Sequence, residues 1–433
     1  MQHFFPIVLF VSCVLNVCTF AFAQFPSSLL SQETLSGDWS GHRSTLQERG
    51  FTFELGYIGE VWSNLSGGRS QKTAYLDNVD LQLTLDAEKA FGWQGARIFV
   101  YGLGNQGDNP SSFVGDFQII SNIESPATWK LFEAWFQQNF FDNRYSLLVG
   151  LYDVNAEFDY AESAQLFLHS SFGIGPDFSQ SGENGPSIFP TTSFGVRFAA
   201  RLLAQLYLQA AVLDGVAGDP NAPHGTQIIF GSDDGLLVTT EATYLIGTGE
   251  EKEGGGIGRG YEIPYRGKIA VGGWFYTEKF DDIRTIEGQR RTHKRSGNHG
   301  VYGLAEYTVW NEPEHPDQAL TFFLQIGLAD LEVNQISLYT GGGGVYTGLL
   351  PGRDDDEVGF AIAAAHNGRR FKQAQRSMGS PVENSEIAFE LTYRAQLTPW
   401  FALQPVFAYV VNPGTDPHLD DAVVFGMRFE VTL

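Results

Sequence analysis

The sequence contains almost no cysteine and, after residue 23, no long apolar run. Its two cysteines, Cys13 and Cys18, both lie in the uncharged apolar stretch MQHFFPIVLFVSCVLNVCTFAFA, residues 1–23. This stretch ends in the small-residue pattern Ala-x-Ala, which is typical of a secretory signal peptide cleaved before Gln24. An uncleaved anchor helix is the alternative. A mature chain from Gln24 would carry no cysteine and would fold without disulfides.

Basic residues are also scarce. The chain has 27 Lys and Arg against 50 Asp and Glu, a formal net charge of −23 at pH 7. Nucleic acid is therefore not an expected partner, because a phosphate-binding surface needs clustered Lys and Arg. The one basic island, residues 290–295, is interpreted as a solvated loop. No stretch after Ala23 provides the roughly 18 apolar residues of a membrane helix. Such a composition fits a soluble acidic protein or a membrane β-barrel.

Motifs for catalysis and metal binding are missing as well. The sequence contains neither G-x-S-x-G nor H-E-x-x-H. GLGNQG, residues 102–107, matches a nucleotide-binding glycine pattern, but Asp-Asn-Pro follows it where a helix would have to begin. The acidic run at residues 354–357 lacks the ligand spacing of an EF-hand. We expect no enzymatic activity, no cofactor and no metal, with a barrel enzyme or adhesion protein as the competing class.

Alternation of apolar and polar residues is what the sequence has in abundance. In residues 423–433, six apolar side chains share one face and Arg428 and Glu430 lie on the other. A strand of this length, rising about 3.3 Å per residue, crosses a hydrocarbon core when it is tilted. Similar runs predict about sixteen strands near residues 51–62, 76–86, 96–103, 131–139, 145–152, 192–202, 205–213, 236–246, 266–277, 300–310, 319–329, 333–340, 357–365, 385–396, 400–411 and 421–433.

The predicted connections alternate, with some exceptions, between short and long. Residues 141–144 form a tight turn, whereas residues 104–130 and 153–191 are long. This parity is typical of an outer-membrane barrel. The predicted fold class is therefore all-β, a transmembrane antiparallel β-barrel of about 16 strands over residues 51–433. Residues 24–50 form an N-terminal segment with a short helix. A soluble secreted β protein is the alternative.

Several stretches carry a resemblance to a known family. They are LSGDWSGHRSTLQERGFTFELGYIGEVW, IPYRGKIAVGGWFYTEKFDD, GVYGLAEYTVW, GLLPGRDDDEVGFAIAAAHN and the last 43 residues, from Leu391 to Leu433. In their order and spacing the chain resembles the carbohydrate-selective outer-membrane porins of the OprB type. The resemblance implies a sixteen-stranded barrel that passes monosaccharides such as glucose through the outer membrane of a Gram-negative cell. Val406 and Ala408 depart from it, because polar residues are commoner there.

The first of these stretches places Trp39 between two Gly/Ser pairs. Ser36 or Asp38 is suited to cap a short helix ahead of the first strand. We expect this piece to border the periplasmic mouth. Packing of Trp39 is the favoured role, and contact with sugar is the alternative.

Selective passage of a neutral sugar needs charged or amide groups that replace its hydration, together with aromatic faces, and the binding must be weak. Alternation places many such side chains on the inner face, among them Glu60, Asp80, Asp86, Tyr101, Gln137, Arg201, Glu306, Glu390 and Arg428. The predicted substrate-binding residues are Glu54, Arg97, Glu133, Trp135, Arg197, Glu241 and Arg394. For each, an ion pair within the wall is the alternative. Trp135→Ala is predicted to weaken sugar occupancy more than ion conductance.

The longest connection, residues 153–191, is the candidate constriction loop, and an external lid is the alternative. The expected partners are small neutral sugars and outer-membrane lipid, and the sequence leaves monomer and homotrimer open. A general or cation-preferring porin without a sugar site is the second functional hypothesis, because the net charge is strongly negative.

Overall fold

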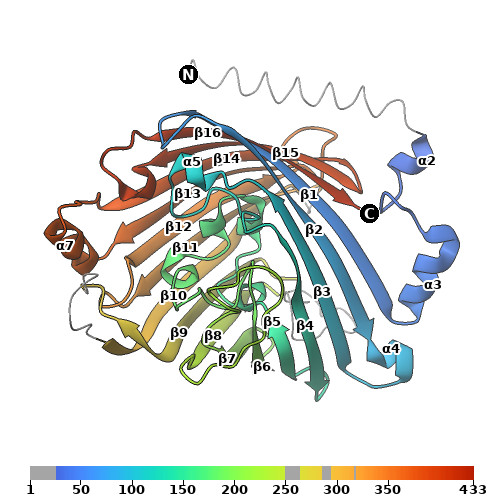
Figure 1. Cartoon of the computed structure of the whole chain (residues 1–433). Coiled ribbons are helices and arrows are strands. Elements are labelled where there is room, and N and C mark those ends of the chain that lie inside the picture. The colour runs from blue at the N-terminus through green and yellow to red at the C-terminus, as the bar shows by residue number, and fades with distance from the viewer. Residues whose placement is uncertain (1–25, 249–263, 285–293, 316–317) are drawn as a thin grey trace.

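Sixteen antiparallel strands close into one barrel (Figure 1). The computed structural model describes residues 26–248, 264–284, 294–315 and 318–433, so the predicted signal peptide at residues 1–23 lies outside the described residues. Each strand pairs with its neighbours in sequence, and β1 pairs with β16. The strands are β1 Phe51–Ser66, β2 Thr73–Asp86, β3 Ala96–Gly107, β4 Thr128–Phe140, β5 Tyr145–Tyr152, β6 Ser193–Arg201, β7 Leu206–Asp214, β8 Leu236–Ile246, β9 Gly267–Asp281, β10 Lys294–Asn311, β11 Ala319–Ala329, β12 Ile336–Thr347, β13 Glu357–Asn367, β14 Ser385–Thr398, β15 Phe401–Val411 and β16 Ala422–Thr432.

The predicted fold class is confirmed, and every predicted strand has its counterpart. The largest error concerns β12, which was expected at residues 333–340 and ends at Thr347 instead. The strand contains the run Gly341–Gly344 in its middle, which has no side chains and therefore no alternation to detect. The start of β10 at Lys294 was missed for a related reason. Charged and polar residues fill its extracellular end, so the apolar phase is absent there.

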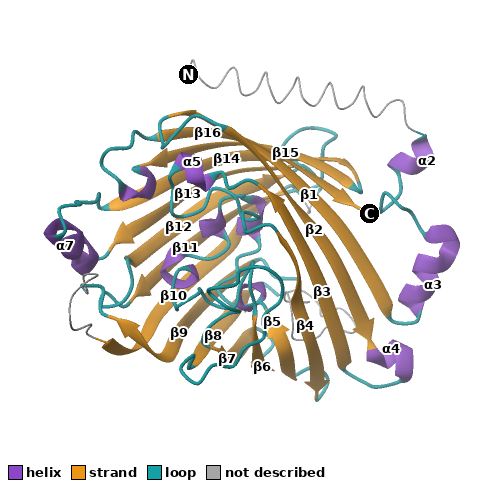
Figure 2. Cartoon of the chain, in the orientation of Figure 1, coloured by secondary structure: helices purple, strands orange, loops and turns teal. Residues whose placement is uncertain are grey.

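Short helical segments accompany the strands (Figure 2). Three precede the first strand, namely α2 Ser27–Leu30, η1 Trp39–Gly41 and α3 His42–Glu48, whereas α4 Ala87–Phe91 joins β2 to β3 and α7 Arg369–Ser377 lies between β13 and β14. The long connections contain α5 Ser111–Val114, η2 Val154–Ala156, η3 Ser163–Leu166, η4 Ser170–Phe172, α6 Pro176–Ser179 and η5 Pro413–Thr415. Among the described residues, no helix is long and apolar enough to cross a membrane.

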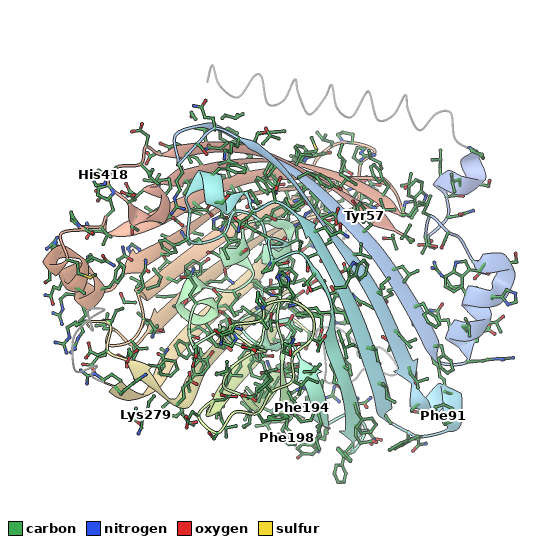
Figure 3. The ribbon with its side chains drawn as sticks, in the orientation of Figure 1. Tyr57, Phe91, Phe194, Phe198, Lys279 and His418 are labelled. Carbon is green, nitrogen blue, oxygen red and sulfur yellow. The ribbon has the colours of Figure 1, made fainter. Side chains whose placement is uncertain are left out.

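The outer face of the wall is apolar. On β11 the outward residues Phe322, Leu324, Ile326 and Leu328 are 47–62% exposed, while Phe323 and Gln325 on the inner phase are buried. Phe194 and Phe198 belong to the same outer face on β6 (Figure 3). This alternation is what a lipid-facing barrel requires, because one face meets hydrocarbon and the other meets the lumen.

The N-terminal segment binds the outside of the barrel at its periplasmic end. The Trp39 ring lies 6.3 Å from the ring of Phe53, which is on the outer phase of β1. Arg43 lies over Trp39, 4.4 Å from its ring, and donates from Nη2 to the carbonyl oxygen of Leu433 at 2.8 Å. Asp38 accepts from the amide of Ser44 at 2.8 Å in the first turn of α3. Trp39 therefore has a packing role, and it holds the guanidinium against the end of β16.

Replacement of Arg43 by alanine should loosen this attachment. We expect Arg43→Ala to lower the free energy of unfolding by about 1–2 kcal/mol, because a charged donor to a backbone carbonyl is lost. Urea unfolding of the refolded barrel in detergent, followed by tryptophan fluorescence, measures the change. Arg49→Ala is the matched control, since Arg49 is exposed at the end of the same helix. An equal effect of both substitutions would contradict a specific clamp.

Candidate functional site

Two connections fill much of the barrel interior. Residues 108–127 join β3 to β4, and residues 153–192 join β5 to β6. Their apolar side chains form clusters with inward residues of the wall. Val406 and Ala408, which depart from the family pattern, are each 1% exposed and pack in one cluster with Phe113, Val114 and Ile120. These two wall positions are apolar because an apolar loop covers them.

Inward glutamates attach both loops to the wall. Glu390 on β14 accepts from the backbone amides of Leu168 and His169 at 2.8 and 2.9 Å. Glu306 on β10 accepts from the amide of Ser163 at 3.1 Å, and Glu241 on β8 accepts from that of Asp159 at 3.0 Å. Glu386 on β14 holds the first loop in the same way, through the amides of residues 117 and 118 at 3.1 Å. A carboxylate that accepts backbone amides forms strong charge-assisted bonds.

Arg197 on β6 holds the second loop from the other side. Its guanidinium is fully buried and forms an ion pair with Glu157, with Nε to Oε2 at 2.7 Å. It also donates to the hydroxyl of Ser146 at 2.8 Å and to the side-chain oxygen of Gln137 at 3.0 Å. Buried charges in proteins are paired, and removal of one partner is costly. This arginine therefore has a structural function under the loop.

The loops leave a cavity of about 680 Å³ beside strands β1 to β4. Its wall side includes Asp80, Tyr101 and Arg428, and its loop side includes Asn122, Glu124, Asn155 and Gln165. The β7–β8 connection also lines it, through Gly218, Asp219, Ala222, Pro223, Gly225 and Gln227. Apolar residues, among them Ile58, Ile119 and Phe132, are interspersed with these polar groups. The cavity therefore reaches from the extracellular loops to the middle of the wall.

The polar groups of this cavity are held in position by their neighbours. Asp80 accepts from the hydroxyl of Tyr101 and from Nδ2 of Asn78, the latter at 2.6 Å. Arg428 donates from Nε to Oε1 of Glu60 at 2.6 Å and from Nη2 to Oδ1 of Asn122. A fixed carboxylate and a fixed guanidinium thus border one space, with a phenol and amides between them. Such a set exchanges hydrogen bonds with hydroxyl groups and carries both signs of charge.

Comparison with known proteins identifies the family. Residues 70–433 match the model of the carbohydrate-selective porins, OprB family. The chain belongs to this family. It is 25% identical over 426 residues to Porin B of Pseudomonas aeruginosa, covering 91% of this chain and 90% of that one. It is 22% identical over 464 residues to the putative porin QuiX of Acinetobacter baylyi, across the full length of both.

Solved structures agree in fold. The high-pH structure of Pseudomonas putida OprB superposes with a TM-score of 0.81 at 21% identity, covering 93% of this chain and 99% of that one. The low-pH structure of the same protein gives a TM-score of 0.59 at 19% identity. This OprB-family porin is accordingly an outer-membrane channel with a preference for carbohydrate, and it is not an enzyme. Among the described residues no group of His, Cys, Asp and Glu is arranged to hold a metal ion.

Four of the predicted substrate-binding residues of this porin lie against the inner loops. Glu133 and Arg197 are 0% exposed, Glu241 is 5% exposed and Trp135 is 7% exposed. Glu133 accepts from Nε1 of Trp135 at 3.1 Å and from the amide of Asp153 at 3.2 Å, and it also borders the cavity. The Trp135 ring stacks on Phe99 at 5.1 Å. Little of this ring faces the lumen, so removing it is expected to act through packing.

The other three predicted residues lie near the periplasmic mouth. Glu54 on β1 is exposed on the inner phase, and Arg97 on β3 is half-buried on the inner phase. Arg394 on β14 donates from Nη2 to Oε2 of Glu430 at 2.8 Å and lines a second space of about 470 Å³. The seven predicted residues thus form two groups. Four are covered by the inner loops, and three lie near the periplasmic mouth of the barrel.

Loop residues were missed by sequence reasoning. Asn122, Glu124, Asn155 and Gln165 line the cavity, but loops have no periodicity that would indicate direction. Alternation places Asp80, Tyr101 and Arg428 on the inner face, but the predicted substrate-binding set does not include them. Their positions on neighbouring strands could have selected them. Asp80 on β2 and Arg428 on β16 lie on either side of β1, and Tyr101 lies on β3, which pairs with β2.

Loosening of the second loop is predicted for Glu390→Gln. The amide retains one acceptor but loses the charge that strengthens the bonds to Leu168 and His169. We expect larger and noisier single-channel conductance in planar bilayers. Glu383→Gln is the matched control, because Glu383 precedes the same strand and, in the described part of the chain, its carboxylate has no hydrogen bond. Identical traces for both variants would argue against this attachment.

The charge of the cavity should depend on pH through Glu124. Burial raises the pKa of this carboxyl to about 7, although it accepts from the amide of Ser111 at 3.0 Å. The group is neutral below that pKa and negative above it. We therefore expect cation preference, measured as reversal potential in a KCl gradient, to increase between about pH 6 and pH 8. Glu124→Gln should flatten this increase, and an unchanged slope would contradict it.

Proposed function

We propose that this porin conducts small neutral sugars of monosaccharide size through the cavity beside β1 to β4. In this proposal residues 153–192 form the constriction, because glutamates on three strands and a buried arginine hold them inside the barrel. The observation that carries the proposal is the lining of the cavity. Asp80, Tyr101 and Arg428 meet loop amides across it, with apolar residues between them. Hydroxyl groups of a sugar exchange their hydration for such partners, and its C–H faces contact the apolar ones.

A second contact region follows toward the periplasm. Glu54, Arg97 and Arg394 lie there on the inner phase and are at least partly exposed. A sugar that leaves the cavity would meet these groups next. Because several weak contacts along a path permit both entry and release, this arrangement suits conduction. The cavity lies within one chain, so the proposal holds for a monomer and for a homotrimer alike.

A general or cation-preferring pore is the competing function, and the net charge of −23 favours it. Carboxylates such as Asp80 and Glu124 in the cavity lining also favour it, whereas Arg428 opposes it, because a guanidinium beside the cavity raises the energy of a passing cation. Single-channel current in planar bilayers, titrated with glucose, maltose and a charged solute, separates the two. Saturable block by a neutral sugar supports the proposal. Strong cation preference without any sugar block would leave the general pore.

Asp80→Asn tests the cavity directly. We expect the concentration of glucose that gives half-maximal block to increase about tenfold, because a hydrogen bond to a charged acceptor is lost. Asp77→Asn is the matched control. Asp77 lies on the same strand and carries the same charge, but its alternation places it on the outer face. Equal block in Asp80→Asn and in the unmodified porin would remove this cavity from the sugar path.

A further inference from the structure

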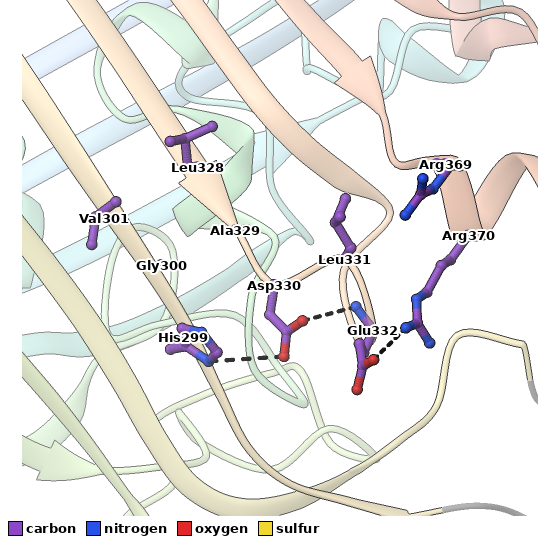
Figure 4. Close-up of a pocket in the computed structure, with 10 residues that line it drawn as sticks. All are labelled: His299, Gly300, Val301, Leu328, Ala329, Asp330, Leu331, Glu332, Arg369 and Arg370. Atoms are coloured by element: carbon purple, nitrogen blue, oxygen red, sulfur yellow. Dashed lines mark hydrogen bonds and ion pairs between the residues drawn. The ribbon is translucent and has the colours of Figure 1, made fainter.

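A separate cavity lies on the outside of the barrel at its extracellular rim (Figure 4). Its volume is about 570 Å³, and it is bordered by the ends of β10 and β11, the β11–β12 connection and the start of α7. His299, Asp330, Glu332, Arg369 and Arg370 provide its polar side, and Val301 and Leu328 provide apolar surface. Val301 and Leu328, which line it, are exposed on the outer phase of the wall, so this cavity is separate from the lumen.

The position of the cavity coincides with the edge of the apolar belt. Val301 and Leu328 are the last apolar residues on the outer phases of β10 and β11, and they are 54% and 48% exposed. The next outward positions toward the cell exterior are His299 and Asp330. In an outer-membrane barrel such a change from apolar to charged side chains marks the level of the lipid headgroups.

The rim around this cavity is basic, unlike the chain as a whole. Helix α7 carries Arg369, Arg370, Lys372 and Arg376 and contains no acidic residue. It stands beside the ends of β9 and β10, where Arg284, Lys294 and Arg295 add further positive charge. The acidic residues of the same region are Asp281, Asp282, Asp330 and Glu332. Basic residues therefore outnumber acidic ones here, although the chain has a net charge of −23.

The acidic groups of the rim are already paired. Glu332 lies between Arg295 and Arg370, with each N–O distance at 2.5 Å. Asp282 accepts from Arg284 and Arg295 at 2.8 to 3.0 Å, and these hydrogen bonds, that of Arg284 first, hold the pKa of this carboxyl well below its usual range. Arg369 is exposed and forms no ion pair within the described part of the chain. Its guanidinium is available to an anion that enters the cavity.

We propose that this cavity binds the phosphorylated headgroup of an outer-leaflet lipid, with Arg369 and Arg370 at the phosphate and Val301 and Leu328 against the first part of its acyl chains. Guanidinium groups match phosphate oxygens with paired donors. Basic pockets beside membrane-spanning elements are suited to lipid headgroups, and each Lys or Arg near the surface contributes measurably to that attraction. The basic rim thereby attaches the extracellular end of the barrel to the surrounding leaflet.

Native mass spectrometry of the detergent-purified, full-length porin tests this assignment. The probe is lipid A with both phosphates, compared with the same lipid after phosphatase treatment. We expect one retained copy of the phosphorylated form and much weaker retention of the other. Arg369→Gln should weaken retention about fivefold, and Arg369→Gln with Arg370→Gln about twentyfold. Resistance to SDS at room temperature verifies that each variant is a folded barrel.

The matched control is Lys372→Gln with Arg376→Gln, which removes the same charge from α7 outside the cavity. It should retain lipid nearly as the unmodified porin does. An equal loss in both double variants would show that general surface charge attracts the lipid and would overturn the site. Equal retention of the two lipid forms would mean that apolar contact alone holds them. Full competition by millimolar inorganic phosphate would identify an anion site rather than a lipid site. Either result overturns the proposal.

Discussion

In a bilayer every backbone polar group needs a partner within the protein, and closure of β1 on β16 meets that requirement here. The two strands are registered over residues 56–66 and 423–432, and at this seam Phe429 faces Gly59. A Cβ atom at Gly59 would come within 2.3 Å of the Phe429 ring, so the close approach requires glycine. Closure also fixes the phase of each strand. It thereby decides which half of the side chains faces lipid and which half faces the lumen.

Two loops cover much of the inner phase. Many of its charged side chains therefore form hydrogen bonds with loop residues instead of with water. Glu241, Glu306 and Glu390 are all buried, and each accepts a backbone amide of residues 153–192. One set of contacts thus serves two needs. The wall carboxylates receive donors, and the loop amides, which have no strand partner, receive acceptors. The covered part of the lumen becomes protein core, and the uncovered part remains open for solute.

Charge is distributed unevenly between the parts of the barrel. The cavity of the lumen is lined by Arg428 and by several carboxylates, among them Asp80 and Glu124, so it presents both signs of charge to a neutral sugar. At the extracellular rim, arginines gather around a few paired carboxylates, and Arg369 is left exposed. A net charge summed over the whole chain therefore describes neither the solute path nor the surface that meets the lipid.

The sequence by itself determined the strands, their number and the face to which each side chain points, because a period of two is a local property that needs no partner strand. It failed locally where that period is absent, as in Gly341–Gly344. It correctly placed Arg197, Glu241 and Trp135 on the inner phase, yet only the tertiary structure decided that loops cover them. Which inward residues remain open depends on contacts between Glu390 and Leu168, more than 200 positions apart in the chain. Such contacts have no local pattern, since loop conformation follows from the wall that the loop meets.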